Sequence, residues 1–310
     1  MKNIFFCITP LECLIAKKII NNNFNKNQCE LFFFNSISND IIKHYYEDLG
    51  LNCYKSKFYL LNKRFPRYIF DIKNFFKNKK YENVYVSALD SVIIHIALSR
   101  IKYKNLITFD DGLGNILKDG IYHKKRKHPF HKRFLYFLLG NRFSTSKIIK
   151  SSKVHYTIFK EFENVVSKKP IYIKLFDFKN INKNKKECNV ILGTVFSEYY
   201  KKIDKKISIS KFQKFVSNFK NITFYIKHPR EEDLIIENIQ KIEKNKIAEE
   251  IIAELFKEFE FINLYGFMST TQFNLISHNN IQHHFILNNE KRVSQGIKLL
   301  QNKKIFIHRL

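Results

Sequence analysis

The sequence predicts an α/β protein built on mostly parallel, doubly wound sheets. Short apolar runs typical of buried strands alternate with stretches of helical spacing along the 310 residues, and this alternation indicates parallel βα units. Charged or polar residues follow several of these runs directly. A polar stretch, Lys179–Glu187, separates two such series. We therefore expect two α/β domains, residues 1–180 and 188–310, with ligand-binding residues at the carboxyl ends of their strands.

The N-terminal series opens with the apolar run Asn3–Ile8, which Thr9-Pro10 closes, as expected for a buried strand. Apolar residues then recur at helical spacing up to residue 22, and Gly50 ends a second helical stretch. The same patterns predict strands at residues 3–8, 30–35, 53–57, 83–87, 105–109, 154–159 and 171–176, and helices at 11–22, 38–49, 66–79 and 91–102.

The C-terminal series restarts with the apolar run at residues 188–192, immediately after the polar stretch. Further apolar runs predict strands at 222–227 and 260–264. Helical spacing predicts helices at 208–219, 231–239 and 246–258, one that begins near Thr271 and one at 290–300. We read the residues after 300 as a basic C-terminal tail.

Two adjacent carboxylates, Asp110 and Asp111, follow the strand at 105–109. Neighbouring carboxylates resist simultaneous ionisation, so we expect the pKa of one to be raised, which suits a group that accepts a proton from an attacking hydroxyl. Gly112 permits the tight turn that would aim them at a ligand. The alternative is an ordinary Asp-Gly turn.

A histidine flanked by cations, Lys227-His228-Pro229-Arg230, ends the strand at 222–227. Pro229 favours an extended backbone at His228. The two cations suit a phosphate, and a protonated imidazole could give its proton to a departing phosphate. The alternative is a surface histidine in a basic loop.

A strand, a glycine and then hydroxyl residues open the helix that begins near Thr271, which is the pattern of a phosphate-binding turn or of a simple N-cap. A carboxylate of the acidic helix at 246–258 could bind the two ribose hydroxyls of a nucleotide, although a solvated helix face is the alternative. The further binding candidates are Gly193, Thr194, Glu249, Glu250, Tyr265, Gly266, Phe267, Ser269 and Thr270.

The net charge of +27 favours anionic partners such as phospholipid headgroups, nucleic acid or sugar nucleotides, although it also fits a merely lysine-rich surface. Basic residues and aromatics cluster at 122–134, where either a membrane surface or a solvated loop could explain them. Five scattered cysteines suggest free thiols in a reducing cytosol. No metal-ligand spacing, no Asp-x-Asp motif, no nucleic-acid motif and no transmembrane run is visible, so we expect neither metal nor cofactor.

Taken together, these segments resemble the bacterial lipooligosaccharide and capsule sialyltransferases of glycosyltransferase family 52. The resemblance lies in Cys7-Ile-Thr9-Pro10-Leu, Phe109-Asp-Asp-Gly-Leu-Gly-Asn115, Lys227-His-Pro-Arg230 and Tyr265-Gly-Phe-Met-Ser-Thr270, in that order along nearly the whole chain. It implies a GT-B fold, with two Rossmann-like domains facing each other across a cleft. The N-terminal domain would carry the acceptor side and the general base, and the C-terminal domain would bind the CMP-sugar.

The same resemblance implies inverting, metal-independent transfer from CMP-N-acetylneuraminate to a terminal galactose of a surface glycan, with an α2,3 linkage expected. Asp111 would be the base supported by Asp110, although Asp90 or Asp204 could take that role. His228 would act on the phosphate, and Thr9 would belong to the binding residues. The alternative is a transferase of another nucleotide-activated hexose. We expect a peripheral position on the inner face of the cytoplasmic membrane, and the resemblance makes a homodimer plausible.

Overall fold

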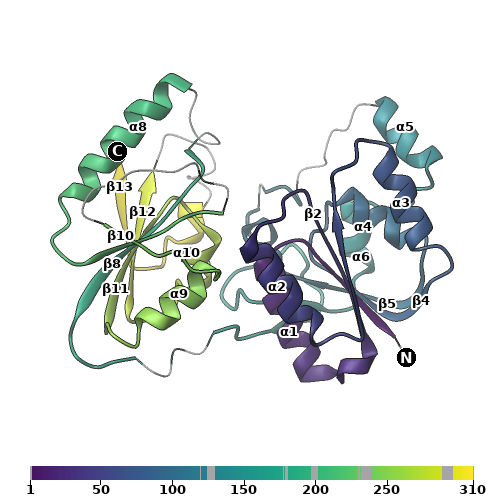
Figure 1. The fold of residues 1–310 in the computed structure, drawn as a ribbon, viewed down its shortest axis with the longest axis horizontal. Helices are drawn as coiled ribbons and strands as arrows, with labels where there is room; N and C mark the ends of the chain where they lie inside the picture. The colour runs from purple at the N-terminus through teal and green to yellow at the C-terminus, as the bar shows by residue number, and fades with distance from the viewer. Residues whose placement is uncertain are drawn as a thin grey trace. The chain divides into compact units, whose positions relative to one another are not determined.

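The computed structural model describes residues 2–118, 120–123, 130–176, 178, 181–196, 202–229, 231, 239–287 and 296–309, with the backbone alone at 130–133 and 202–207. The chain divides into two compact units, Met1–Leu175 and Phe176–Leu310 (Figure 1). The change from one unit to the other falls just before the polar stretch that suggested a linker.

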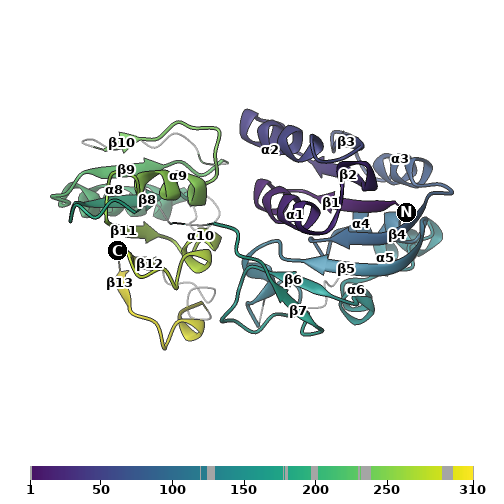
Figure 2. The ribbon, with the colours of Figure 1, turned by 90° about the horizontal axis from the view of Figure 1, so that it is seen from below.

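The N-terminal unit is built on seven parallel strands in the order β3-β2-β1-β4-β5-β6-β7, which can be followed from edge to edge in Figure 2. The strands are β1 (Asn3–Cys7), β2 (Cys29–Asn35), β3 (Lys55–Leu60), β4 (Lys80–Val86), β5 (Lys102–Phe109), β6 (His155–Thr157) and β7 (Pro170–Tyr172). The strand order reverses between β1 and β4. In doubly wound sheets, ligands bind beside such a reversal, at the carboxyl ends of the strands.

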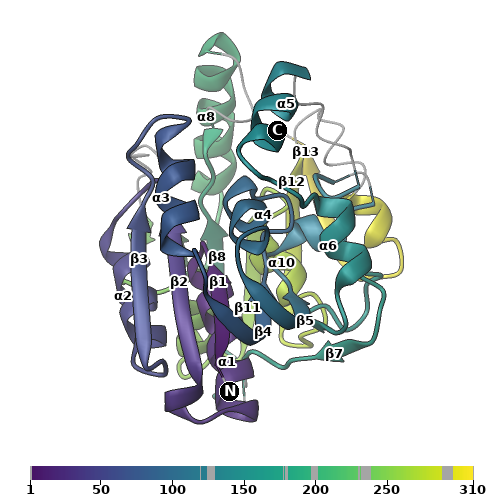
Figure 3. The ribbon, with the colours of Figure 1, turned by 90° about the vertical axis from the view of Figure 1, so that its right-hand side faces the viewer.

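Helices cover both faces of this sheet (Figure 3). They are α1 (Pro10–Asn23), α2 (Asp40–Gly50), α3 (Arg67–Phe75), α4 (Val92–Leu98), α5 (Phe130–Leu138) and α6 (Thr145–Ser151). Because successive side chains of a strand alternate in direction, β1 sends Ile4 and Phe6 to the face covered by α3, α4 and α6. Phe5 points the other way and stacks on Tyr85, with ring centroids 4.1 Å apart. Both faces of β1 are thus buried, which explains its uninterrupted apolar sequence.

The C-terminal unit repeats the same plan with six parallel strands in the order β10-β9-β8-β11-β12-β13. The strands are β8 (Glu187–Leu192), β9 (Thr223–Ile226), β10 (Gln240–Lys241), β11 (Phe261–Gly266), β12 (Ile281–Leu287) and β13 (Ile305–Arg309), and the helices are α8 (Lys202–Ser217), α9 (Ala248–Leu255) and α10 (Thr270–Asn274). Helix α9 packs on one face of the sheet and α8 on the other. The reversal of strand order lies between β8 and β11, so the two units share the Rossmann-type order.

The structure confirms the doubly wound α/β class and most of the expected strands. It adds three strands that the sequence analysis did not predict: β10, β12 and β13. Strand β12 contains Gln282, His283 and His284 between apolar residues, and such polar residues hid it from a search for apolar runs. We read β13 as a basic tail, which was wrong because Ile305–Arg309 pairs with β12 in parallel. Residues 232–238 of the helix expected at 231–239, and residues 290–295 of the one expected at 290–300, lie outside the described residues.

All five cysteines are buried free thiols. Burial raises the pKa of Cys29, Cys53 and Cys188 to about 12, so these thiols stay protonated at neutral pH. In the part of the chain that the structure describes, no helix is both long and apolar enough to cross a membrane.

Candidate active site

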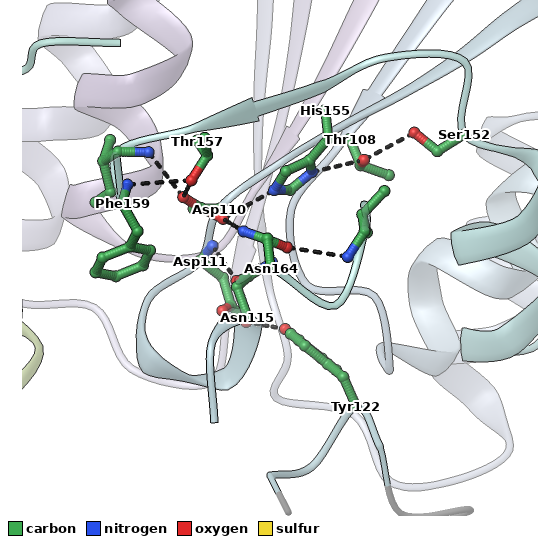
Figure 4. A network of polar contacts seen from close by, with 12 residues as sticks. Thr108, Asp110, Asp111, Asn115, Tyr122, Ser152, His155, Thr157, Phe159 and Asn164 are labelled. Carbon is green, nitrogen blue, oxygen red and sulfur yellow. Dashed lines mark hydrogen bonds and ion pairs between the residues drawn. The ribbon is translucent and has the colours of Figure 1, made fainter. Parts of the chain in front are cut away.

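Asp110 lies at the end of β5 and is completely buried. One carboxylate oxygen accepts hydrogen bonds from His155 Nε2 (2.9 Å) and Asn164 Nδ2 (2.7 Å). The other accepts from Thr157 Oγ1 (2.7 Å) and from the backbone N–H of Ile158 (2.8 Å). As Figure 4 shows, these donors come from β6 and the loop after it. Because its own chain supplies four donors, Asp110 fixes the end of β5.

The network continues behind Asp110 into the sheet. The second ring nitrogen of His155, Nδ1, lies 2.8 Å from the Thr108 hydroxyl, which lies 2.8 Å from the hydroxyl of Ser152 (Figure 4). His155, Thr108 and Ser152 are all buried. Buried polar groups are costly unless paired, so a fully paired chain of this kind specifies one arrangement of the strand end.

Asp111 is half-buried and differs from Asp110 in its surroundings. Its backbone N–H donates to Asn115 Oδ1 (3.0 Å), and the Tyr122 hydroxyl donates to its carboxylate oxygen Oδ2 (Figure 4). Burial raises the pKa of Asp111 well above its usual value, and the carboxylates of Glu12 and Asp110 add to the effect. A carboxylate of raised pKa is a better proton acceptor than an ordinary one, as general-base work requires.

The turn after the two aspartates depends on Gly112. Its φ is 138°, in a region that residues with a side chain rarely adopt. The Gly112 carbonyl accepts a hydrogen bond from the Asn115 N–H (3.1 Å), which closes the turn. Asn115 is fully buried and its Nδ2 has no hydrogen-bond partner in the described structure. This amide therefore adds a donor beside Asp111 that the sequence analysis did not single out.

Glu12 is a buried residue that the sequence analysis missed. Its carboxylate oxygen Oε2 accepts from the Ile8 N–H (2.6 Å) and from the Ser87 hydroxyl (2.7 Å), so it joins the ends of β1 and β4 at the reversal of strand order. Thr9, which we expected to bind substrate, caps helix α1 by accepting from the Glu12 N–H (3.3 Å). The spacing Thr9-x-x-Glu12 is that of a capping box, and this signal could have revealed Glu12. Burial raises the pKa of Glu12 to about 7.

In the C-terminal unit, the chain Lys227-His228-Pro229 leaves the end of β9. His228 is half-buried, whereas Lys227 and Pro229 are exposed. Arg230, the fourth member of the predicted motif, lies outside the described residues, and so does the side chain of Asp204. The His228 N–H donates to the carboxylate of Glu231 (3.1 Å), and the Glu231 N–H donates back to the His228 carbonyl (2.9 Å).

The segment after β11 supplies a capped helix start. Ser269 forms a capping box with Gln272: its hydroxyl accepts from the Gln272 N–H (3.2 Å), and its own N–H donates to Gln272 Oε1 (3.2 Å). Tyr265 and Phe267 are buried in the core of the unit. The Tyr265 ring stacks on that of His284, with centroids 4.3 Å apart. Binding by Tyr265, Gly266, Phe267, Ser269 and Thr270 stays a prediction.

The two glutamates of α9 differ in their surroundings. Glu249 is buried and accepts from Asn274 Nδ2 of α10 (2.8 Å), and burial raises its pKa. Glu250 is half-buried. Gly193 and the buried Thr194 follow β8. No cluster of three or more metal-ligating side chains occurs among the residues with described positions.

Two Rossmann-type units in one chain, with carboxylates at a strand end of the first and a histidine at a strand end of the second, have the architecture of the GT-B fold class. A solved structure of similar fold is that of S. aureus MnaA with UDP, at a TM-score of 0.50 and 10% identity, covering 98% of this chain and 89% of that one. At this identity the likeness concerns the fold alone. The cleft between the domains stays a prediction.

The family model "Glycosyltransferase family 52" matches residues 20–289. The chain belongs to glycosyltransferase family 52. It is 28% identical over 286 residues to a CMP-N-acetylneuraminate:beta-galactoside alpha-2,3-sialyltransferase of Pasteurella multocida, covering 89% of this chain and 87% of the relative. It is also 28% identical over 298 residues to an N-acetyllactosaminide alpha-2,3-sialyltransferase of Haemophilus influenzae, covering 92% and 91%.

Proposed function

We propose that this glycosyltransferase is an inverting α2,3-sialyltransferase that moves N-acetylneuraminic acid from CMP-N-acetylneuraminate to a terminal galactose of a surface glycan. The observation that carries the chemistry is the half-buried Asp111 carboxylate, whose pKa burial raises. The donor and acceptor follow from the names of the two relatives, which match this chain over about nine-tenths of its length.

In this reaction the acceptor hydroxyl oxygen forms a bond to the anomeric carbon as the bond from that carbon to the CMP phosphate oxygen breaks. Asp111 takes the hydroxyl proton, and Asp110 holds the strand end from which Asp111 projects. His228 gives a proton or a hydrogen bond to the departing phosphate, and Lys227 and Arg230 add positive charge there. The N-terminal unit would therefore serve the acceptor and the C-terminal unit the donor.

The donor-binding residues are proposed from the capped start of α10 and from α9. Ser269 and Thr270 would hold the phosphate through hydroxyl and N–H groups. Of the two glutamates, Glu250 is the better candidate for the ribose hydroxyls. It is half-buried, whereas Glu249 is buried and already accepts a bond from Asn274. Gly193 and Thr194 at the end of β8 complete the proposed set.

The proposal is tested by transfer from CMP-N-acetylneuraminate to a fluorescent lactoside in the presence of EDTA. We expect wild-type transfer, and losses of about 100- to 10,000-fold in kcat for Asp111→Ala and His228→Ala. Calorimetry should show that both variants still bind CMP. Transfer that survives in Asp111→Ala would overturn the assignment of the base, and Asp90→Ala would then be measured. An enzyme that neither binds CMP nor transfers would refute the donor, and other nucleotide hexoses would be screened.

We further propose that the protein lies on the inner face of the cytoplasmic membrane through α5. Phe134, Phe137 and Leu138 of this helix are 52%, 68% and 62% exposed, and basic residues precede them in the sequence. Exposed rings beside cations suit an anionic interface. Residues 124–129 of the segment 122–134 lie outside the described residues, 130–133 are described by their backbone alone, and the first residue, Tyr122, is buried against Asp111.

Co-sedimentation with vesicles tests this membrane proposal. Phe137→Ser combined with Leu138→Ser should reduce binding to anionic vesicles. Leu51→Ser, which removes an apolar side chain that is 69% exposed elsewhere in the unit, should not. Equal binding by both variants would refute the role of α5. A homodimer, expected from the family resemblance, is tested by sedimentation velocity.

A further inference from the structure

A buried carboxylate, Glu231, lies directly beneath the loop that carries His228. Only 9% of Glu231 is exposed. One carboxylate oxygen accepts the His228 N–H (3.1 Å), and the other accepts the Tyr225 hydroxyl. The backbone closes the same loop in the opposite direction, since the Glu231 N–H donates to the His228 carbonyl (2.9 Å). Two hydrogen bonds of opposite direction thus join His228 to Glu231.

Gly193, at the end of the neighbouring strand β8, makes room for this carboxylate. A Cβ at Gly193 would clash with Glu231 Oε2 and would lie 2.8 Å from the His228 backbone nitrogen and 2.9 Å from the Tyr225 hydroxyl oxygen. The Gly193 N–H also donates to the Ile226 carbonyl (2.8 Å), which ties the end of β8 to the end of β9. The glycine, the carboxylate and the histidine loop therefore fit together as one unit.

A buried carboxylate is an expensive way to close a turn. Burial raises the pKa of Glu231, because desolvation disfavours its charge, while the Tyr225 hydroxyl, the His228 N–H and the charges of Lys227 and Lys241 oppose that rise. A neutral capping side chain could satisfy one N–H with less desolvation. Glu231 instead engages two donors, one on β9 and one on the loop, and so ties the loop to its strand.

We propose that Glu231 is a positioning residue that holds the His228 imidazole in place for the leaving phosphate, with Gly193 as the space it requires. This inference rests on the proposed function of His228 in transfer. Glu231 touches the loop backbone and acts through His228. A catalytic group that is displaced by about 1 Å loses about 100-fold in rate. Loss of the Glu231 hydrogen bonds should therefore lower mainly kcat.

The test is a double-mutant cycle. Glu231→Gln keeps the size of the side chain but replaces one of its two acceptor oxygens with a donor. The cycle compares wild type, Glu231→Gln, His228→Ala and the double variant, with Glu258→Gln, an exposed position in the same unit, as the matched control. We expect Glu231→Gln to lower kcat about 10- to 100-fold and to change KM for the donor less than threefold. In the His228→Ala background it should have no further effect, because both changes remove the same contribution.

A second readout separates the failure of this inference from failure of the proposed function. The ring ¹³C–¹H signal of His228 is assigned by its loss in His228→Ala and followed during a pH titration. We expect Glu231→Gln to shift and broaden this signal, and Glu258→Gln to leave it unchanged. An unchanged His228 signal in Glu231→Gln would overturn the positioning role whatever the activity. An equal loss of kcat in both backgrounds would overturn it too, since Glu231 would then act independently of His228. If His228→Ala retains full transfer, the role of His228 fails, and the signal alone decides whether Glu231 anchors the loop.

Discussion

Adjacent acidic residues in this protein have different surroundings. Asp110 accepts four hydrogen bonds from its own unit and is completely buried, whereas Asp111 is half-buried and has a raised pKa. The sequence predicted the pair and a raised pKa for one of them. Burial is the largest cause of that rise, and Glu12 precedes Asp110 among the charges that contribute. A residue 99 positions away in sequence cannot be recognised as a neighbour before the sheet is known.

At Asp110 we expect substitution by asparagine to lower the stability of the protein. Asp110→Asn replaces a carboxylate oxygen with an NH₂ group that faces donors, so two of the four bonds fail and buried donors stay unpaired. The free energy of unfolding should fall by about 3 kcal/mol. Urea unfolding followed by circular dichroism measures it. Glu163→Gln, which breaks only an exposed ion pair with Lys118, should stay within about 0.5 kcal/mol of wild type. Similar stabilities for the two variants would contradict the structural role of Asp110.

At Glu12 we expect substitution by glutamine to stabilise the protein by an amount that depends on pH. Its pKa rises from 4.5 to about 7 on folding, so the unfolded chain ionises first and the native state loses stability as pH rises from about 4.5 to about 7. Glu12→Gln keeps an oxygen that can accept from Ile8 and Ser87 but carries no charge. It should stabilise the protein by up to roughly 3 kcal/mol at pH 8 and by little at pH 4.5.

Urea unfolding at the two pH values measures this difference, with the exposed Glu47→Gln as control. The same substitution removes a charge that raises the pKa of Asp111. The acid limb of the pH profile of kcat/KM should therefore move to lower pH. A gain in stability that is the same at both pH values would show that Glu12 does not titrate as proposed.

At the scale of elements, the candidate residues occupy the ends of strands because the thirteen strands that the structure describes are parallel within their sheets. Parallel strands place their carboxyl ends along one edge, so each motif after an apolar run falls on that edge. Helix starts then set the local geometry. The capping box of Ser269 with Gln272 fixes the first turn of α10, and the Thr9 side chain, which accepts from the Glu12 N–H, fixes that of α1.

Substitution of Gly266 tests the geometry at the start of α10. A Cβ there would lie 2.7 Å from Gln272 Oε1, and the buried Gln272 also donates to the His284 carbonyl (3.0 Å). Gly266→Ala should disrupt the capping box, lower stability by about 1–3 kcal/mol and weaken CMP binding measured by calorimetry. Gly140→Ala, where a Cβ meets nothing within 4 Å, tests only the cost of a φ of 82° and should leave CMP affinity unchanged. A Gly266→Ala variant that binds CMP as tightly as wild type would show that the start of α10 does not contact the donor.

At the scale of the whole molecule, the two units respond to acid with opposite signs. His283 and His284 of β12 have pKa values lowered by burial to about 4, so they bind protons in the unfolded chain before the native one. Their contribution to stability is lost as pH falls from about 6.5 towards 4, whereas Glu12 makes the N-terminal unit more stable as pH falls from about 7 to about 4.5.

Hydrogen exchange of the full chain tests this difference between the units. Corrected for intrinsic rates, the protection of β12 amides should fall between pH 7 and pH 5, while that of β1 amides should not. His283→Gln keeps a donor for the Leu275 carbonyl, which His283 Nε2 contacts at 3.0 Å, and should reduce the loss in β12. Equal loss in β1 and β12 would contradict the assignment to these histidines.

The sequence by itself determined the α/β class, the parallel sheets, the order of the motifs and the family, because apolar periodicity and strand-end motifs are local properties of the chain. It also singled out Asp111 and His228. The tertiary structure decided the separate surroundings of Asp110 and Asp111, and it revealed Glu12 and Glu231 as the buried carboxylates near them. It also showed β12, whose polar residues hide its burial, and β13, a largely exposed strand that pairs with it. These features depend on which distant residues pack together, and burial, pairing and pKa are set by that packing rather than by neighbours in sequence.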